Sequence, residues 1–143
     1  MSQRETVELL TLVRADRRDV IEERWTPGTV TLLRLAAQLP ETDRVLVNPA
    51  IKKRLCDSVT GDRSWLRRIR PWYGHAAHMH VHLRCPAGQS ECIAQAEPPA
   101  GEGCDATLAW WFEQLDAPLA KPSKPTPPPP MPAACRAILS GAG

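Results

Sequence analysis

The chain has 143 residues, of which 43% are hydrophobic, 24% are charged and 5% are aromatic. This length and composition suffice for one modest hydrophobic core and predict a single domain. A formal net charge of +2 gives no support to nucleic-acid binding, and the absence of any apolar run of about 18 residues excludes a membrane span.

Local signals place the first elements. Residues 1–24 mix charged and aliphatic side chains without a clear period, and no element is predicted there. Thr26 followed by Pro27 is typical of a helix N-cap with proline at the first helical position, so a helix is predicted over residues 27–40. Residues 44–48 (RVLVN) then predict a short strand.

The later elements follow a similar alternation. A second helix that starts with proline is predicted over residues 49–56, and a third over residues 63–69, where Asp62 can cap the first turn. Residues 77–84 (AHMHVHLR) predict a strand and residues 105–114 (DATLAWWFEQ) a helix. The expected fold class is α+β: a small antiparallel sheet that carries the histidine strand, with flanking helices, disulfide-stapled loops and a proline-rich tail.

The composition changes near Asp116. A dense group of prolines follows (KPSKPTPPPPMP), which predicts an extended tail over residues 117–143 after a domain of residues 1–116. The first residues, MSQRETVELLTLVRADRRD, lack the basic-then-apolar layout of a secretion signal. Taken alone, they predict a chain that starts in the cytosol.

The cysteines indicate export from the cytosol. Their spacing fits neither a zinc ribbon nor a C-x-x-C redox pair, and their proline- and glycine-rich loops predict a disulfide framework, as in exported proteins. A bridge between Cys85 and Cys92 would contribute about 2.5 kcal/mol on the chain-entropy model. Because there are five cysteines, one lacks a partner. It is either a free buried thiol or the partner of a cysteine outside this sequence.

All four histidines lie within eight residues: His75, His78, His80 and His82. The last three alternate with apolar residues, so a strand would place three imidazoles on one face, about 6.6 Å apart along the strand. His80 could then hold a metal while His78 reaches its bound water as a general base. Alternatively, the histidines line a polar sheet face. Without a carboxylate, the pattern supplies half of a metal site.

Two further clusters have two interpretations each. A basic segment that ends in Pro71-Trp72-Tyr73 could cradle an anionic ligand, although a solvated helix face is the preferred reading. Its cations are Lys52, Lys53, Arg54, Arg63, Arg67, Arg68 and Arg70. The aromatic side chains of residues 110–112 are predicted to be part of the core rather than of a cleft.

Three segments carry a resemblance to a known family. Residues 47–56 (VNPAIKKRLC), 62–86 (DRSWLRRIRPWYGHAAHMHVHLRCP) and 98–112 (PPAGEGCDATLAWWF) closely resemble the carboxy-terminal part of penicillin-insensitive murein endopeptidases. These are periplasmic zinc peptidases related to lysostaphin and to D-alanyl-D-alanine metallopeptidases. The resemblance covers most of the chain, and its most specific motif is H-x-x-H-x-H between W-L-R-x-x-R-P-W and C-P.

The resemblance assigns roles to the histidines. It implies that His80, the last histidine of the motif, is a zinc ligand and that His78 is the active-site histidine beside the metal. His75 is implied to lie near the catalytic water and to be needed for activity. His82 matches no ligand of the family.

Other positions match less completely. Trp72 and Arg70 stand where the family has the same residues, at the edge of the cleft. Some members hold a second metal through an upstream aspartate and histidine. Asp16 matches that aspartate, whereas Asp19 stands in the place of the histidine. The implied cofactor is therefore Zn²⁺, with Asp16 as the candidate for a second site that lacks its histidine.

The resemblance also implies how the cysteines pair. Cys85 pairs with Cys92, Cys56 with Cys104, and Cys135 with a cysteine near the mature amino terminus, which these 143 residues lack. The family's other two zinc ligands, a histidine and an aspartate in an upstream H-x6-D motif, are missing as well. These departures predict a carboxy-terminal piece of a longer exported enzyme, which binds zinc weakly by itself. A genuine short paralogue is the alternative.

The sequence therefore predicts a zinc-dependent murein endopeptidase that cleaves D-alanyl-diaminopimelate cross-links of peptidoglycan in the periplasm, here as a fragment lacking two metal ligands. The expected partners are the cross-link peptides, with no nucleic acid and no membrane span. One alternative is a catalytically inactive remnant that binds murein through its basic and aromatic groups. Another is a disulfide-stapled structural protein whose histidines bind nothing.

Overall fold

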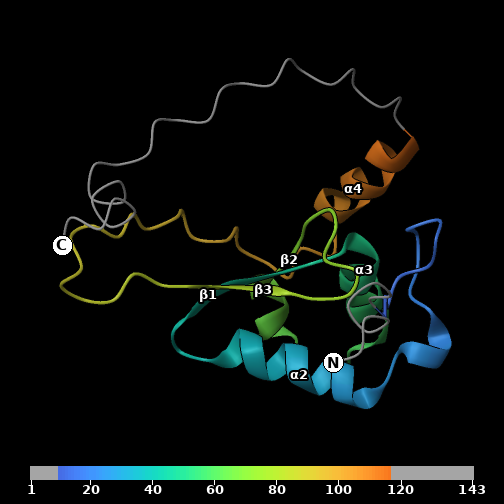
Figure 1. The fold of residues 1–143 in the computed structure, drawn as a ribbon, viewed down its shortest axis with the longest axis horizontal. Helices are drawn as coiled ribbons and strands as arrows, with labels where there is room; N and C mark the ends of the chain where they lie inside the picture. Colours follow the sequence, from blue (N-terminus) through green and yellow to red (C-terminus); the bar gives the residue numbers. More distant parts are fainter. Residues whose placement is uncertain (1–9, 117–143) are drawn as a thin grey trace, which may run out of the picture.

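The computed structural model describes residues 10–116 (Figure 1). The predicted tail, residues 117–143, lies outside this part, and so does Cys135. No helix in the described part is long and apolar enough to cross a membrane. The described elements are η1 (Glu22–Arg24), α2 (Pro27–Gln38), β1 (Thr42–Val47), α3 (Pro49–Ser58), η2 (Ser64–Arg68), β2 (Ile69–Pro71), β3 (His80–Leu83) and α4 (Ala106–Asp116).

The helices begin where short polar side chains cap them. In α2, the Thr26 side chain accepts a hydrogen bond from the Thr29 backbone N–H, and proline occupies the first position. In α3, Asn48 Oδ1 accepts from the Ala50 N–H in the same way. Both helices are confirmed, and so is α4, whose first turn donates a backbone hydrogen bond to Asp105 Oδ1.

The helix predicted over residues 63–69 is only partly confirmed. Residues Ser64–Arg68 form a 3-10 helix, and the Asp62 carboxylate accepts a hydrogen bond from the Ser64 N–H at its start. Ile69 already belongs to β2, a strand that was not predicted. A three-residue strand has too few positions to show a periodic pattern, and its pairing with β1 is non-local.

The three strands of the described part form one sheet in the order β2-β1-β3. β3 pairs antiparallel with β1 as expected, whereas β2 pairs parallel with it, so the sheet is mixed rather than antiparallel throughout. The α+β class is confirmed. Leu46, at the centre, is the register partner of both Arg70 on β2 and His80 on β3, so these three side chains share one face.

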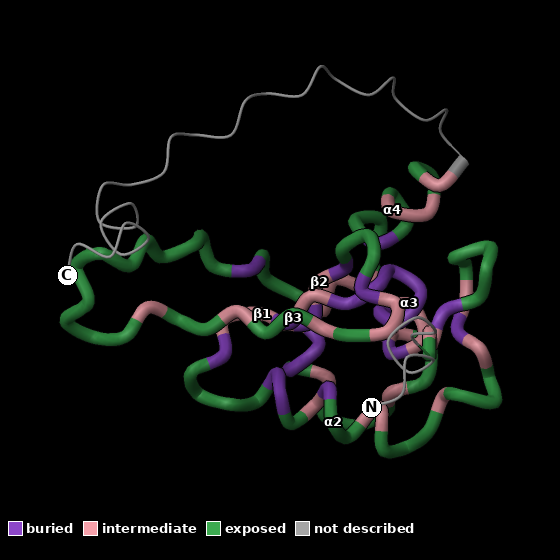
Figure 2. The backbone as a smooth tube through the Cα atoms, in the orientation of Figure 1, coloured by how far each residue is buried: buried purple, intermediate pink, exposed green. Residues whose placement is uncertain are grey.

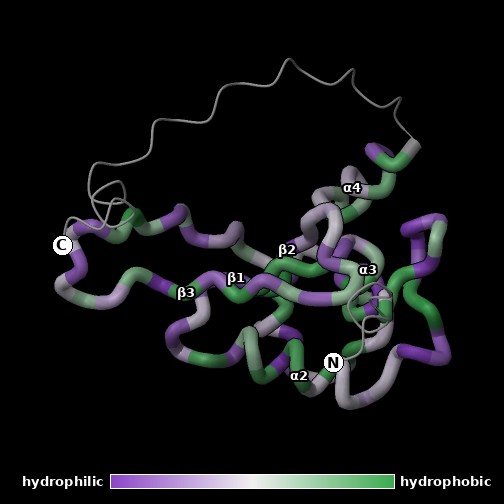
Figure 3. Tube along the Cα trace, viewed as in Figure 1, coloured by the Kyte–Doolittle hydropathy of each residue, from purple (hydrophilic) through white to green (hydrophobic). Residues whose placement is uncertain are grey.

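The two faces of the sheet differ in polarity. Val45, Val47 and Ile69 point to one face and are fully buried, and α2 packs against β1 while α3 packs against β2 (Figures 1 and 2). Hydrophobic segments gather in this interior, as Figure 3 shows along the strands and α2. The opposite face carries Leu46 and polar side chains, and α4 lies on this side. The fold thus presents the histidine strand on its open, polar face.

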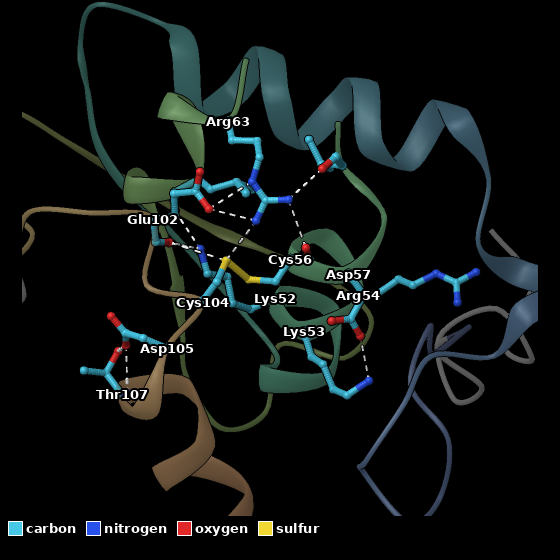
Figure 4. Close-up of a disulfide and its surroundings, with 12 residues drawn as sticks. Lys52, Lys53, Arg54, Cys56, Asp57, Arg63, Glu102, Cys104, Asp105 and Thr107 are labelled. Atoms are coloured by element: carbon cyan, nitrogen blue, oxygen red, sulfur yellow. Dashed lines mark hydrogen bonds and ion pairs between the residues drawn. A yellow bond between two sulfur atoms is a disulfide. The ribbon is translucent and has the colours of Figure 1, made fainter. Parts of the chain in front are cut away.

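Disulfides fix the loops that follow the sheet. Cys56–Cys104 joins α3 to the loop before α4, and Cys85–Cys92 closes a short loop after β3, as the resemblance implied. Beside Cys104, the guanidinium of Arg63 donates two hydrogen bonds to the Glu102 carboxylate (Figure 4). The loop is therefore tied to the domain by both a covalent bond and an ion pair.

Most cationic side chains of the basic segment donate hydrogen bonds to other groups of the chain. Lys52 is fully buried, and its Nζ donates to the backbone carbonyls of Leu66 and Glu102. Burial, and secondarily the positive charge of Arg70, lower the pKa of Lys52 to about 7. Arg67 and the other cations except Arg70 also donate to carboxylates or backbone carbonyls. The interpretation as a solvated helix face is therefore wrong for Lys52, which is buried, whereas the side chains of Lys53 and Arg67 stay 42% and 41% exposed in their ion pairs.

Candidate metal centre

The histidine cluster is built from a loop and the start of a strand. β3 spans His80–Leu83, so the strand predicted over residues 77–84 is confirmed only for these four residues. The prediction of three imidazoles in a row along it is wrong, because His78 lies in the preceding loop. Instead, the ring nitrogens of His75, His78 and His80 lie within 4.8 Å of one another. His82 does not belong to this group, as the resemblance implied for it.

The three rings lie close enough to act on one ligand. Ring centroids are 4.4 Å apart between His75 and His80, 5.0 Å between His78 and His80, and 5.1 Å between His75 and His78. Partial desolvation lowers the pKa of His80, and the neighbouring imidazoles, including His82, lower it further. His80 is therefore biased toward the neutral form that a metal requires.

His75 is oriented by its own turn. Its side chain is buried, and Nδ1 lies 2.8 Å from the carbonyl oxygen of Tyr73. A carbonyl can only accept, so Nδ1 donates, and Nε2 of the neutral ring carries the free lone pair. This Nε2 atom is buried and has no hydrogen-bond partner among the described residues. A buried imidazole nitrogen without a partner in the described part of the chain, next to two other imidazoles, fits a site for a metal ion or its water.

Asn48 holds this turn in place. Its Nδ2 atom donates to the carbonyl of Gly74 at 2.7 Å, and its backbone N–H donates to the carbonyl of His75 at 3.2 Å. Gly74 and His75 both have positive φ angles, of 73° and 47°. A left-handed conformation is unfavourable for histidine, so it persists only where surrounding bonds enforce it. Asn48 thus links the start of α3 to the position of the His75 ring.

Replacing Asn48 with serine is expected to weaken zinc binding by about fivefold. Serine is also a good N-cap, so α3 keeps its cap, but serine cannot reach Gly74 and the turn loses a hydrogen bond worth about 1 kcal/mol. Zinc affinity is measured by competition with a chromophoric chelator, alongside thermal unfolding. Thr26→Ala is the control for the general cost of losing a helix cap, because it removes the cap of α2. Equal losses of zinc affinity in both variants would contradict this role.

Aromatic side chains pack together beside the turn that carries His75. Trp72 and Tyr73 are largely exposed, and both contact Trp111 of α4, with ring centroids 5.8 and 4.8 Å apart. The Tyr73 hydroxyl also donates to the backbone carbonyl of Trp111. Trp110 is 49% exposed. The prediction that residues 110–112 belong to the core is therefore wrong, because α4 lies at the edge of the site instead.

The upstream acidic residues do not join the histidines. Asp16 lies between Val13 and Val20, which form an isolated bridge, and its carboxylate accepts a hydrogen bond from the Arg18 N–H. Asp19 accepts from the Val20 N–H. Among the described residues, only the three histidines form a group that could hold a metal ion. A second metal at Asp16 stays a prediction.

Sequence reasoning missed Asn48 and the contact between Tyr73 and Trp111. Asn48 directly precedes Pro49 at a helix start, which is a readable cap signal, and Gly74 before His75 is a signal for a left-handed turn. Neither signal shows that the two features meet. The aromatic contact joins residues 38 apart and has no local signature.

Comparisons with known proteins identify the family of this chain. The sequence model of one family, described as penicillin-insensitive murein endopeptidase, matches residues 1–140. A protein of that name from Yersinia enterocolitica is 52% identical over 128 residues, which are 90% of this chain and 46% of the relative. One from Klebsiella pneumoniae is 50% identical over 130 residues, covering 91% and 47%. The chain thus spans a little under half the length of these curated relatives.

Proposed function

This chain belongs to the penicillin-insensitive murein endopeptidase family, and from that membership we propose that its histidine cluster is part of the centre of a zinc-dependent endopeptidase. The proposed substrate is peptidoglycan, cut at the D-alanyl-diaminopimelate cross-link. The observation that carries the proposal is the group of three imidazoles, one of which has a buried nitrogen without a partner in the described part of the chain.

His80 is the proposed zinc ligand. Zinc bonds to imidazole nitrogen are about 2.0–2.1 Å long, so tetrahedral ligand atoms lie about 3.4 Å apart. The ring nitrogens here are separated by up to 4.8 Å, which suits one ligand with two close neighbours better than three ligands. A zinc ion at His80 would lower the pKa of a coordinated water to near 7 and polarise the scissile carbonyl.

His78 and His75 are the proposed proton-handling residues. An imidazole beside His80 can accept a proton as the nucleophile forms and deliver it to the departing amine. Nε2 of His75 is held as an acceptor by the bond from Nδ1 to Tyr73. No serine is acylated in this scheme, which explains why a family of this chemistry would resist β-lactams, since these acylate active-site serines.

Two further zinc ligands complete the proposal. By resemblance they are a histidine and an aspartate of an H-x6-D motif, which does not occur in these 143 residues. The 143-residue chain alone would then bind zinc weakly and not cleave. Two disulfides in the described part suit an oxidising compartment and support the periplasm as the site of action. A non-catalytic murein-binding role is the alternative.

The test is a chimera in which this chain replaces the matching 46% of the Yersinia enterocolitica relative. We expect the chimera with zinc to cleave cross-linked muropeptides, and His78→Ala to lower the rate by at least about 100-fold, as expected when a general base is lost. His82→Ala is the matched control and should retain activity. Chromatography of the muropeptides gives the rate.

Two outcomes would contradict the proposal. Unchanged cleavage by the His78→Ala chimera would remove the assigned base. Turnover by the 143 residues alone would show that no further ligands are needed. An inactive chimera that still bound murein would favour the non-catalytic alternative.

A further inference from the structure

Arg70 differs from the other cations of its segment. Six of the seven donate hydrogen bonds to carboxylates or backbone carbonyls: Lys52, Lys53, Arg54, Arg63, Arg67 and Arg68. Arg70 donates no hydrogen bond to any residue in the described part, and no carboxylate there lies within 4 Å of its guanidinium. Its positive charge is therefore available to a ligand.

The environment of Arg70 makes that charge costly to leave unpaired. Its side chain is half-buried, and burial, with a further contribution from Arg44, lowers its pKa, while the carboxylate of Asp105, beyond ion-pair distance, acts in the opposite direction. The guanidinium lies against the backbone at Gly103, where a Cβ atom would come within 2.8 Å of Nη1. Gly103 also has a positive φ of 68°, a conformation that favours glycine, and the absence of a side chain leaves room for the guanidinium. A partly desolvated guanidinium without a hydrogen-bond partner favours an anionic ligand.

A hollow of about 160 Å³ lies beside this guanidinium. Its walls are Arg44, Leu46, Arg70, Pro71, Trp72 and Trp111. The two arginines supply positive charge and the two tryptophans supply flat apolar walls. Arg44 is already bonded to Asp43 and to the Ala96 carbonyl, so Arg70 is the arginine with free donors.

The hollow lies on the same sheet face as the histidine cluster. Arg70, Leu46 and His80 are successive register partners across the three strands. Two strand spacings separate β2 from β3, which is about 10 Å. An extended peptide spans about 3.3–3.6 Å per residue, so this separation corresponds to about three residues. A group bound at Arg70 and a bond cleaved at His80 can belong to one peptide.

We propose that the hollow at Arg70 is a carboxylate-binding subsite that recognises a free carboxylate of the peptide substrate, two or three residues from the scissile bond. The planar guanidinium can bind a carboxylate through two parallel hydrogen bonds, while Trp72 and Trp111 cover the adjoining aliphatic part. The identification of the ligand as a murein peptide rests on the proposed function. The anion site itself rests on the unpaired arginine and the hollow.

The experiment is a binding titration of the metal-free chain, so that it does not depend on zinc or on cleavage. N-acetyl-D-alanine is compared with its neutral amide and with inorganic phosphate, and the indole N–H signals of Trp72 and Trp111 are followed by NMR. We expect the carboxylate to bind at least tenfold more tightly than the amide and to shift both signals. Tighter binding of phosphate than of the carboxylate would overturn the assignment of the ligand.

Matched variants locate the site. Arg70→Gln should weaken carboxylate binding at least tenfold, and Arg70→Lys should weaken it less, because lysine keeps the charge without the planar pair of donors. Lys53→Gln removes the same charge from an exposed ion pair with Asp57 and should change nothing. Equal binding of acid and amide by the unaltered chain, or full binding by Arg70→Lys and Arg70→Gln alike, would refute the subsite.

Discussion

In the chimera with the Yersinia enterocolitica relative, replacing His80 with alanine is expected to lower the zinc affinity by at least about 100-fold, because it removes the proposed ligand itself. Loss of a residue that only orients a ligand already costs about 10–100-fold in other metal sites. The rings of His75, His78 and His80 form a triangle with centroids 4.4–5.1 Å apart, so neither neighbour can take the place of His80 without moving the strand or the turn. Affinity is measured by competition with a chromophoric chelator.

His82→Ala is the control for that variant. His82 is on the same strand, two residues away, but outside the group of close ring nitrogens. We expect its zinc affinity to stay within about twofold of the unaltered chimera. If both variants lost zinc equally, binding would depend on histidine content rather than on the geometry of the cluster.

Removing the Cys56–Cys104 disulfide by a double change to serine should lower the free energy of unfolding by about 4 kcal/mol, on the chain-entropy model. The two cysteines are 48 residues apart, so reduction frees a long loop in the unfolded chain. In the folded state the bond holds the loop that leads into α4 and Trp111. Urea denaturation followed by circular dichroism measures the loss.

The second disulfide provides the comparison. Cys85 and Cys92 are only 7 residues apart, and serine at both should cost about 2.5 kcal/mol. Only the Cys56–Cys104 disulfide holds the loop that leads into α4. Only its loss should therefore disturb the packing of Trp111 on Tyr73 in the folded state and change the fluorescence of Trp111. A larger loss from the Cys85–Cys92 pair would contradict the loop-entropy explanation.

Elements with local signals could be predicted from the sequence. Thr26-Pro27 and Asn48-Pro49 specify helix starts within a few residues, because capping and a fixed proline φ act locally. The pairing of Cys56 with Cys104 came from the family resemblance and not from spacing. The same resemblance implied that His82 does not belong with the other three histidines. The alternation of histidines and apolar residues could not show this.

Features that depend on contacts between distant segments were missed. β2 exists because residues 69–71 pair with β1, and no three-residue pattern reveals that pairing. His78 lies outside β3, because the pairing of β3 with β1 begins only at His80. Trp111 reaches Tyr73 because a disulfide positions α4. In each case tertiary contacts override the local pattern.

Anomalous X-ray scattering at the zinc edge, from crystals of the chimera grown with zinc, tests the metal centre most directly. The proposal predicts a peak about 2.0–2.1 Å from a ring nitrogen of His80, on the side where the rings of His75 and His78 converge. A peak on His82, or zinc bound elsewhere with none at His80, would contradict it.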